Sequence, residues 1–190
     1  MARILAFAGS ARKDSINKKL VQLAARKAEA KGATVTYIDL NDYPMPLYHG
    51  DLEDSEGVPE NARKIRDLFL EHDGLMIACP EYNSSITPLL KNTLDWISRP
   101  DGDTPGGVAF KGRVAALMAT SGGALGGLRG LDHVREILAN VGVHVVPMQA
   151  AVGGFDSAIG ADGELTNERT ASFFESMIDL LIKTCDGLHR

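Results

Sequence analysis

The most polar chemistry in the chain is concentrated in the segment 80–85, Pro-Glu-Tyr-Asn-Ser-Ser. An acid, a phenol, an amide and two hydroxyls occupy five successive positions, which is more than a simple connection needs. The backbone of such a loop could line the edge of a planar heterocycle, with Tyr82 close to its face and Asn83 and Ser85 as polar contacts. Pro80 has no N–H and fixes the turn. The alternative for Tyr82 is a half-buried anchor that only holds the loop.

A second polar segment, residues 9–17, has the character of a phosphate site. It joins an apolar run, residues 4–8, to a helical pattern that begins near Ile16. The N-terminus of a helix offers unpaired N–H groups and the positive end of a dipole. Ser10, Ser15 and Asn17 can add side-chain donors, and Arg12 adds a permanent, fork-shaped cation. The alternative is that Ser15 only caps the helix and Arg12 is a solvated surface residue.

A third segment is rich in glycine: Ser121, Gly122 and Gly123 are followed by Gly126 and Gly127. Small residues would let a ligand ring approach the backbone. Glycines alone do not distinguish this from a helix-entry turn that needs unusual dihedral angles.

The elements that position these segments follow from apolar periodicity. Strands are expected at 4–8, 33–39, 74–79 and 114–119, with a short fifth strand at 143–146 that ends at Pro147. Helical patterns follow each strand, so all three polar segments lie at the carboxyl edge of one sheet, where open α/β folds bind ligands. The sequence predicts a single doubly wound α/β domain over residues 1–190, with helices on both faces. Within the helix after residue 85, Trp96 is expected to pack, and Asn92 to serve a subunit contact or face water.

Net charge, hydrophobicity and missing motifs exclude several classes of function. The net charge of −5 argues against non-specific binding of nucleic acid. The apolar N-terminal run is too short for a membrane span and lacks a signal-peptide layout, so a cytoplasmic protein is expected. Neither the dinucleotide G-x-G-x-x-G fingerprint nor a P-loop is present, which favours a mononucleotide ligand over resident NAD.

The cysteines and histidines indicate neither a metal site nor a catalytic triad. Cys79 ends an apolar strand and is expected to be an inert buried residue, whereas Cys185, near a polar C-terminus, could be reactive. His49, His72, His133, His144 and His189 are scattered, and solvated or packed roles are preferred for them. No residue is predicted to be catalytic.

The chain resembles the NADPH-dependent FMN reductase family of flavodoxin-like proteins. The resemblance rests on Gly9-Ser10-x-Arg12-x-x-Ser15-x-Asn17 and on Pro80-Glu81-Tyr82-Asn83-x-Ser85 followed by Leu90-Lys91-Asn92-x-x-Asp95-Trp96. It implies a five-stranded parallel sheet in the order 2-1-3-4-5. The cofactor-binding positions that it implies are Ser10, Arg12, Ser15, Ile16 and Asn17 for the FMN phosphate, and Pro80, Glu81, Tyr82, Asn83, Ser85 and Ser121, with Gly122 beside them, for the isoalloxazine ring.

The resemblance also implies the activity. Bound FMN would take a hydride from NADPH or NADH and reduce a small-molecule acceptor, which is a quinone, a free flavin, an azo compound or a metal oxyanion. Arg12, Lys13, Arg99 and Arg129 are candidates to recognise the 2′-phosphate of NADPH. The alternatives are an electron carrier without NAD(P)H oxidation of its own and a regulatory flavin sensor. A homodimer or homotetramer is expected, although residues 129–133 lack the aromatic residue that bridges subunits in the quinone and chromate reductase branch.

Overall fold

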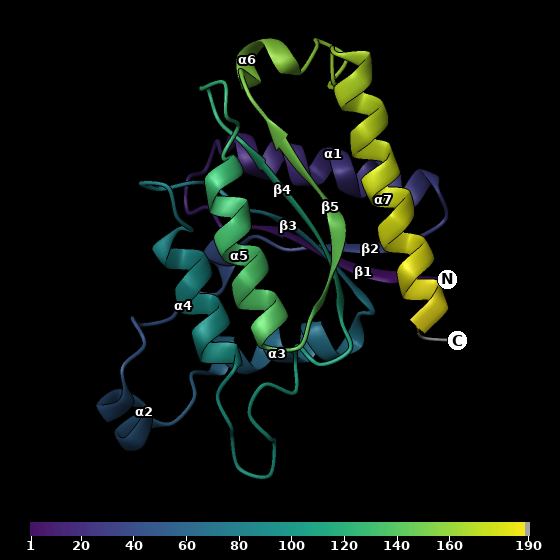
Figure 1. Ribbon diagram of the computed structural model, residues 1–190. Coiled ribbons are helices and arrows are strands. Elements are labelled where there is room, and N and C mark those ends of the chain that lie inside the picture. The colour runs from purple at the N-terminus through teal and green to yellow at the C-terminus, as the bar shows by residue number, and fades with distance from the viewer. Residues whose placement is uncertain (189–190) are drawn as a thin grey trace.

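The computed structural model describes residues 1–188 and is built around a five-stranded parallel sheet (Figure 1). The strands run in the order β2-β1-β3-β4-β5, which confirms the predicted flavodoxin-like arrangement. Their bounds are Arg3–Ala8 for β1, Thr34–Tyr37 for β2, Gly74–Ala78 for β3, Val114–Thr120 for β4 and His144–Val152 for β5.

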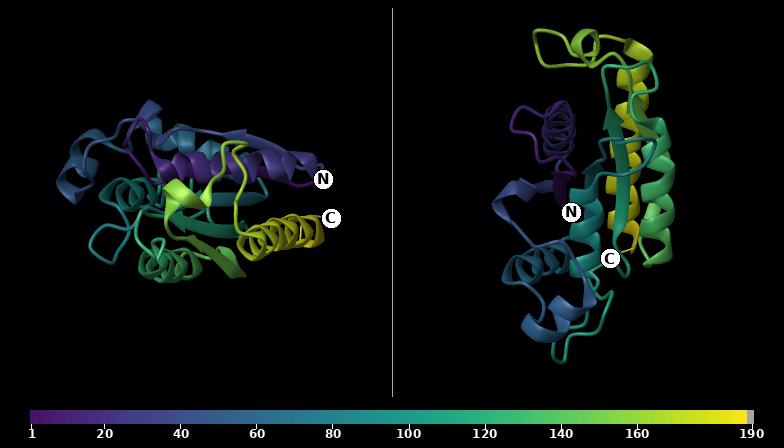
Figure 2. Two further views of the ribbon diagram at one scale, coloured as in Figure 1. Left: turned by 90° about the horizontal axis from the view of Figure 1, so that it is seen from above. Right: turned by 90° about the vertical axis from the view of Figure 1, so that its left-hand side faces the viewer.

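Helices cover both faces of the sheet, as expected. One apolar cluster joins the sheet to α1 (Ile16–Ala30) and α7 (Glu168–Leu188). A second cluster joins the opposite face to α3 (Glu60–Glu71), α4 (Pro88–Ile97) and α5 (Leu128–Asn140). The short helix α6 (Phe155–Ala158) and the loop at 99–112 lie at opposite ends of the molecule (Figure 2).

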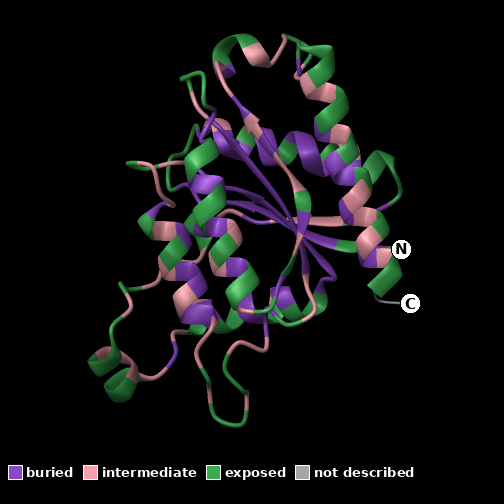
Figure 3. Ribbon diagram, viewed as in Figure 1, coloured by how far each residue is buried: buried purple, intermediate pink, exposed green. Residues whose placement is uncertain are grey.

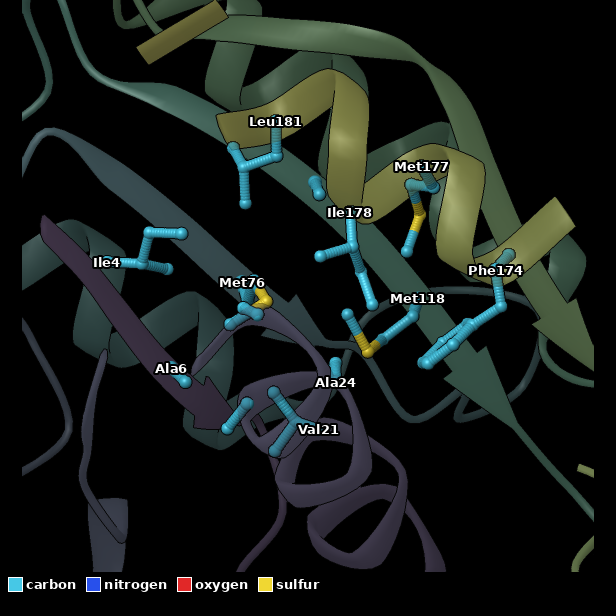
Figure 4. Close-up of a cluster of buried hydrophobic side chains, with 14 of the residues drawn as sticks. Ile4, Ala6, Val21, Ala24, Met76, Met118, Phe174, Met177, Ile178 and Leu181 are labelled. Carbon is cyan, nitrogen blue, oxygen red and sulfur yellow. The ribbon is translucent and has the colours of Figure 1, made fainter. Parts of the chain in front are cut away.

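The central strands are buried because both of their faces are covered. Every residue of β3 and β4 is buried, and these strands form the purple centre of Figure 3. On the α1/α7 side, Met76 and Met118 of the sheet lie near Val21 of α1 and Ile178 of α7 (Figure 4). The uninterrupted apolar runs of the sequence therefore correspond to strands packed on two sides.

The fifth strand is longer than predicted. It continues through Pro147 to Val152, where the sequence pattern placed its end at Val146. The pairing shifts at this point: Val145 faces Ala115, while Gln149 faces Leu117, so β5 bulges against β4. Proline lacks the N–H that a sheet ladder needs, and it is tolerated here because β5 is an edge strand with a bulge at Pro147.

The connection from β2 to α3 contains the 3₁₀ turn η1 (Leu40–Asp42) and α2 (Gly50–Glu56). It is fastened to α4 by two side chains. Asn92 donates to the carbonyl of Pro46 (2.9 Å) and accepts from the N–H of Tyr48 (2.8 Å). The Nε1 of Trp96, which is fully buried as expected, also donates to Pro46 (2.8 Å). Asn92 therefore holds the chain's own connection, a role that the sequence pattern did not indicate.

Both cysteines are buried. Burial raises the pKa of the Cys79 thiol, which agrees with the inert role predicted for it. Cys185, which the sequence left as a possible reactive thiol, packs against Gly74, and burial raises its pKa to about 12. Among residues 1–188, no helix is long and apolar enough to cross a bilayer.

Candidate functional site

Three loops meet at the carboxyl edge of the sheet, after β1, β3 and β4. Side chains join them directly. Asn17, in the first turn of α1, donates to the carbonyl of Thr120 (2.9 Å) and accepts from its N–H (3.0 Å). The hydroxyl of Thr87 donates to the carbonyl of Gly9 (2.6 Å). The three loops therefore meet at one edge of the sheet, as predicted, and buried polar side chains tie the first loop to both of the others.

The first loop presents free N–H groups at the start of α1. Ser15 is the N-cap, and its hydroxyl accepts from the N–H of Lys18 at 3.4 Å. Within residues 1–188, the backbone N–H groups of Ile16 and Asn17 have no acceptor. Arg12 is exposed and has no ion-pair partner in the same range. Two backbone N–H groups at the N-terminus of α1, together with the Arg12 guanidinium, are thus available to bind an anion.

Two predicted donors in this loop have internal partners. The side chain of Asn17 uses both of its polar atoms on Thr120, which leaves its backbone N–H to face a ligand. Ser10 is buried, and its hydroxyl accepts from the N–H of Arg12 at 3.4 Å, which closes a tight local turn. The side chain of Asn17 is therefore committed to Thr120, whereas the Ser10 hydroxyl only accepts, and its own O–H has no acceptor within residues 1–188.

Sequence reasoning missed two supports of the first loop. Lys18 is buried, and its Nζ lies 2.6 Å from the carboxylate of Asp39, after β2. The side chain of Asn41 donates to the carbonyl of Ala11 (2.8 Å). Both partners come from the loop after the neighbouring strand, so no local spacing in the sequence could have paired them.

The second loop contains a strained two-residue turn. The N–H and carbonyl groups of Tyr82 and Ser85 bond with each other at 2.9 and 3.0 Å. Asn83 and Ser84 between them have φ values of 50° and 67°. Such left-handed backbone is characteristic of tight hairpin turns, and it costs non-glycine residues about 1 kcal/mol each. Tyr82 at the rim is 50% exposed.

The side chains at the two legs of this turn face α5. Glu81 accepts from the N–H of Gly130 (3.1 Å) and pairs with Arg129 (3.2 Å). Ser85 lies 2.9 Å from Nδ1 of His133. A hollow of about 460 Å³ separates α5 from the chain beyond the turn and is lined by Ser85–Pro88, His133 and Ile137, among others. Glu81 can therefore offer a ring at this edge its backbone groups rather than a free carboxylate, whereas the backbone groups of Ser85 are paired with Tyr82 and its hydroxyl lies against His133.

The third loop contains glycines of two kinds: one that internal packing requires and one that is exposed. Gly126 has a φ of +60°, and a Cβ there would lie 2.6 Å from the backbone of Val152. It is needed for close packing against β5. Gly122 is exposed, with open space where a Cβ would point, and Ser121 beside it is partly exposed. Gly122 is thus not required by internal packing, and Ser121–Gly122 forms an accessible edge.

The four basic candidates for recognition of a 2′-phosphate are not equivalent. Arg99 is bound to Glu53, with its Nε at 2.8 and 2.9 Å from the two carboxylate oxygens. Arg129 is paired with Glu81. Arg12 and Lys13 are exposed and have no ion-pair partner within residues 1–188, so their charges stay available to a ligand.

The described residues hold no group of three or more His, Cys, Asp or Glu side chains that could bind a metal. Of the histidines, His72 is buried between the carbonyl of Leu68 and the hydroxyl of Thr36, and His49 caps α2. His189 lies outside the described residues. The site thus offers backbone donors, a cation and accessible polar edges.

This sheet order, with three loops that meet after β1, β3 and β4, defines a flavodoxin-like protein. The family described as NADPH-dependent FMN reductase matches residues 2–157, and the chain belongs to that family. It is therefore an oxidoreductase that uses FMN, with NAD(P)H as the electron donor.

Relatives and a solved structure agree with this assignment. The chain is 32% identical over 178 residues to a 2-hydroxy-1,4-benzoquinone reductase of Burkholderia sp, with 93% of this chain and 92% of the relative covered. It is 33% identical to an NADPH:quinone oxidoreductase of Arabidopsis thaliana, with 90% and 85% covered. The structure of FerB, a flavoenzyme NAD(P)H:(acceptor) oxidoreductase of Paracoccus denitrificans, superposes with a TM-score of 0.79 at 28% identity, and 98% of each chain is covered.

Proposed function

We propose that the three loops of this chain hold FMN and that the enzyme reduces a quinone at the expense of NAD(P)H. The observation that carries the proposal is the start of α1: among residues 1–188, two of its backbone N–H groups have no acceptor, and Arg12 in the preceding loop has no ion-pair partner. Phosphate groups bind at such helix ends. The strained turn and the exposed Gly122 lie at the same carboxyl edge of the sheet, where a flat ring system would lie against the backbone.

The residues divide by the part of FMN that each would hold. Arg12 and the N–H groups of Ile16 and Asn17 would bind the phosphate, in a loop shaped by Ser10 and Ser15. The ring would lie against Pro80, Glu81, Tyr82, Asn83, Ser85, Ser121 and Gly122. When bound, FMN supplies the chemistry of accepting a hydride and passing electrons on, so the chain needs no nucleophile or acid–base pair. The residues of the chain would bind FMN, orient it and shield it from solvent.

A quinone is the proposed acceptor because relatives that cover most of this chain are named for quinone substrates. Free flavins, azo compounds and metal oxyanions are weaker candidates. Lys13 is the proposed partner of the NADPH 2′-phosphate, because Arg12 is assigned to the FMN phosphate and Arg99 and Arg129 are engaged internally. We further propose that residues 1–190 form one domain and that the enzyme acts in the cytoplasm as a homodimer, in keeping with the common assembly of the family.

Anaerobic titration tests the proposal. The purified chain is loaded with FMN, and the flavin absorbance is followed as NADPH or NADH is added; reoxidation is then measured with a benzoquinone, free FMN, an azo dye and chromate. We expect bleaching by NAD(P)H and the fastest reoxidation by the quinone. Failure of the chain to retain FMN would refute the site. Retained FMN that NAD(P)H reduces only slowly, together with a stable semiquinone, would favour an electron carrier.

A further inference from the structure

Both legs of the Tyr82–Ser85 turn are fastened to one helix. Glu81, before the turn, reaches Gly130 and Arg129, while Ser85, at its end, meets His133. Gly130 and His133 are three positions apart, so they lie on the same face of α5. The turn proposed to bind the flavin ring is thus set against the first turns of α5, and not against its own strand alone.

The first-turn N–H groups of α5 need a hydrogen-bond acceptor from outside the helix. Its N-cap is Gly127, which has a left-handed conformation and no side chain to accept from the first-turn N–H groups. Uncapped N–H groups at a helix start must find an acceptor elsewhere. The carboxylate of Glu81, 49 positions earlier in the sequence, accepts from Gly130. Its negative charge also lies at the positive end of the helix dipole.

The close packing around Gly130 is consistent with a fixed contact between Glu81 and the start of α5. A Cβ on Gly130 would lie 3.3 Å from the carbonyl oxygen of Ser85 and 3.4 Å from Cβ of Glu81. The side chain of Glu81 is only 13% exposed, whereas that of Arg129 is 58% exposed. A shielded carboxylate without partners would be costly, so Gly130 and Arg129 together hold it in place.

We propose that Glu81 is a positioning residue, whose side chain caps α5 and thereby fixes the strained turn in the conformation that receives the flavin ring. This rests on the proposed function, which makes the turn part of the cofactor site. Asn83 and Ser84 are in left-handed conformations, and such turns persist only when their surroundings hold them. The cap on Gly130 supplies that restraint on the Glu81 side of the turn, while the ion pair with Arg129, whose side chain is largely exposed, contributes little by itself.

Four variants distinguish the contribution of the hydrogen bond from Gly130 from that of the negative charge of Glu81. Glu81→Ala removes the acceptor, Glu81→Gln keeps an oxygen for Gly130 but loses the charge, and Arg129→Gln removes only the ion pair. Glu29→Gln, an exposed glutamate without an ion-pair partner in the described range, is the matched control for loss of one charge.

The first measurement needs no cofactor. Amide hydrogen exchange of the FMN-free protein reports on Gly130 and on the turn. We expect Glu81→Ala to speed exchange at Gly130 and at Ser85 at least tenfold, and Glu81→Gln, Arg129→Gln and Glu29→Gln to leave it within about threefold of wild type. Unchanged exchange in folded Glu81→Ala would overturn the proposed cap whether or not the chain binds FMN.

The second measurement is FMN affinity, taken well below the unfolding transition of each variant. A hydrogen bond to a charged group supports a loss of about tenfold or more in affinity for Glu81→Ala. Glu81→Gln should recover most of the affinity, and Arg129→Gln should stay within about fivefold of wild type. Affinity of folded Glu81→Ala equal to wild type, or equal losses in Glu81→Ala and Arg129→Gln, would overturn the positioning role. Absence of FMN binding by wild type would instead refute the proposed function.

Discussion

Asn17 and Thr120 are 103 positions apart and share two hydrogen bonds, one in each direction. The pair connects the first turn of α1 to the last residue of β4. Both residues are buried. One amide side chain therefore fixes the proposed phosphate loop relative to the proposed ring-binding edge at Ser121.

Replacement of Asn17 by alanine tests this connection. Asn17→Ala leaves the buried N–H and carbonyl of Thr120 without partners, and each such group costs about 1–3 kcal/mol. We expect the free energy of unfolding in urea to fall by about 2–4 kcal/mol and the FMN affinity of the folded variant to fall as well. Asn140→Ala, at an exposed position, should change stability by no more than about 0.5 kcal/mol. Wild-type FMN affinity in Asn17→Ala would contradict the role of the pair in the site.

Thr87 is the corresponding link between the first two loops, and it also caps α4 by accepting from the N–H of Leu90 (3.2 Å). Thr87→Val keeps the shape but loses both bonds, so unfolding should be easier by about 2 kcal/mol. Thr87→Ser should recover most of this difference. Thr184→Val, which loses only a hydrogen bond within α7, is the control. Equal urea midpoints for Thr87→Val and Thr87→Ser would exclude the hydroxyl as the stabilising group.

The sequence predicted the sheet, its flanking helices and the meeting of the three loops, because each depends on local periodicity and on the geometry of parallel strands. It did not predict which side chains join the loops. Glu81 and Gly130, like Asn17 and Thr120, are partners only through the tertiary structure, and no spacing rule links them. The extension of β5 through Pro147 was missed for a similar reason, since tolerance of proline depends on the edge position of that strand.

Cys185 makes stability sensitive to alkaline pH. Its folded pKa of about 12 lies above the value of about 8.5 for an exposed thiol. Between these values the unfolded chain loses the proton while the folded chain retains it, so stability should fall as pH rises from about 8.5 towards 12. In Cys185→Ala this contribution is absent, and the loss of unfolding free energy between pH 8 and pH 10, measured in urea, should be smaller than in wild type. Identical losses would place the pH dependence elsewhere, for example on Cys79, whose pKa burial also raises.

Arg12 provides the sharpest test of the phosphate site, because riboflavin has the ring of FMN without its phosphate. Arg12→Ala removes a cation that has no ion-pair partner among residues 1–188. Loss of a charge-assisted contact predicts FMN affinity weaker by about tenfold or more. Riboflavin affinity should be unchanged, which a fluorescence titration with both flavins measures. Arg26→Ala, on an exposed part of α1, controls for loss of one positive charge. If Arg12→Ala weakened both flavins equally, Arg12 would act on the ring site or on the fold, and the phosphate would have to bind through the helix N–H groups alone.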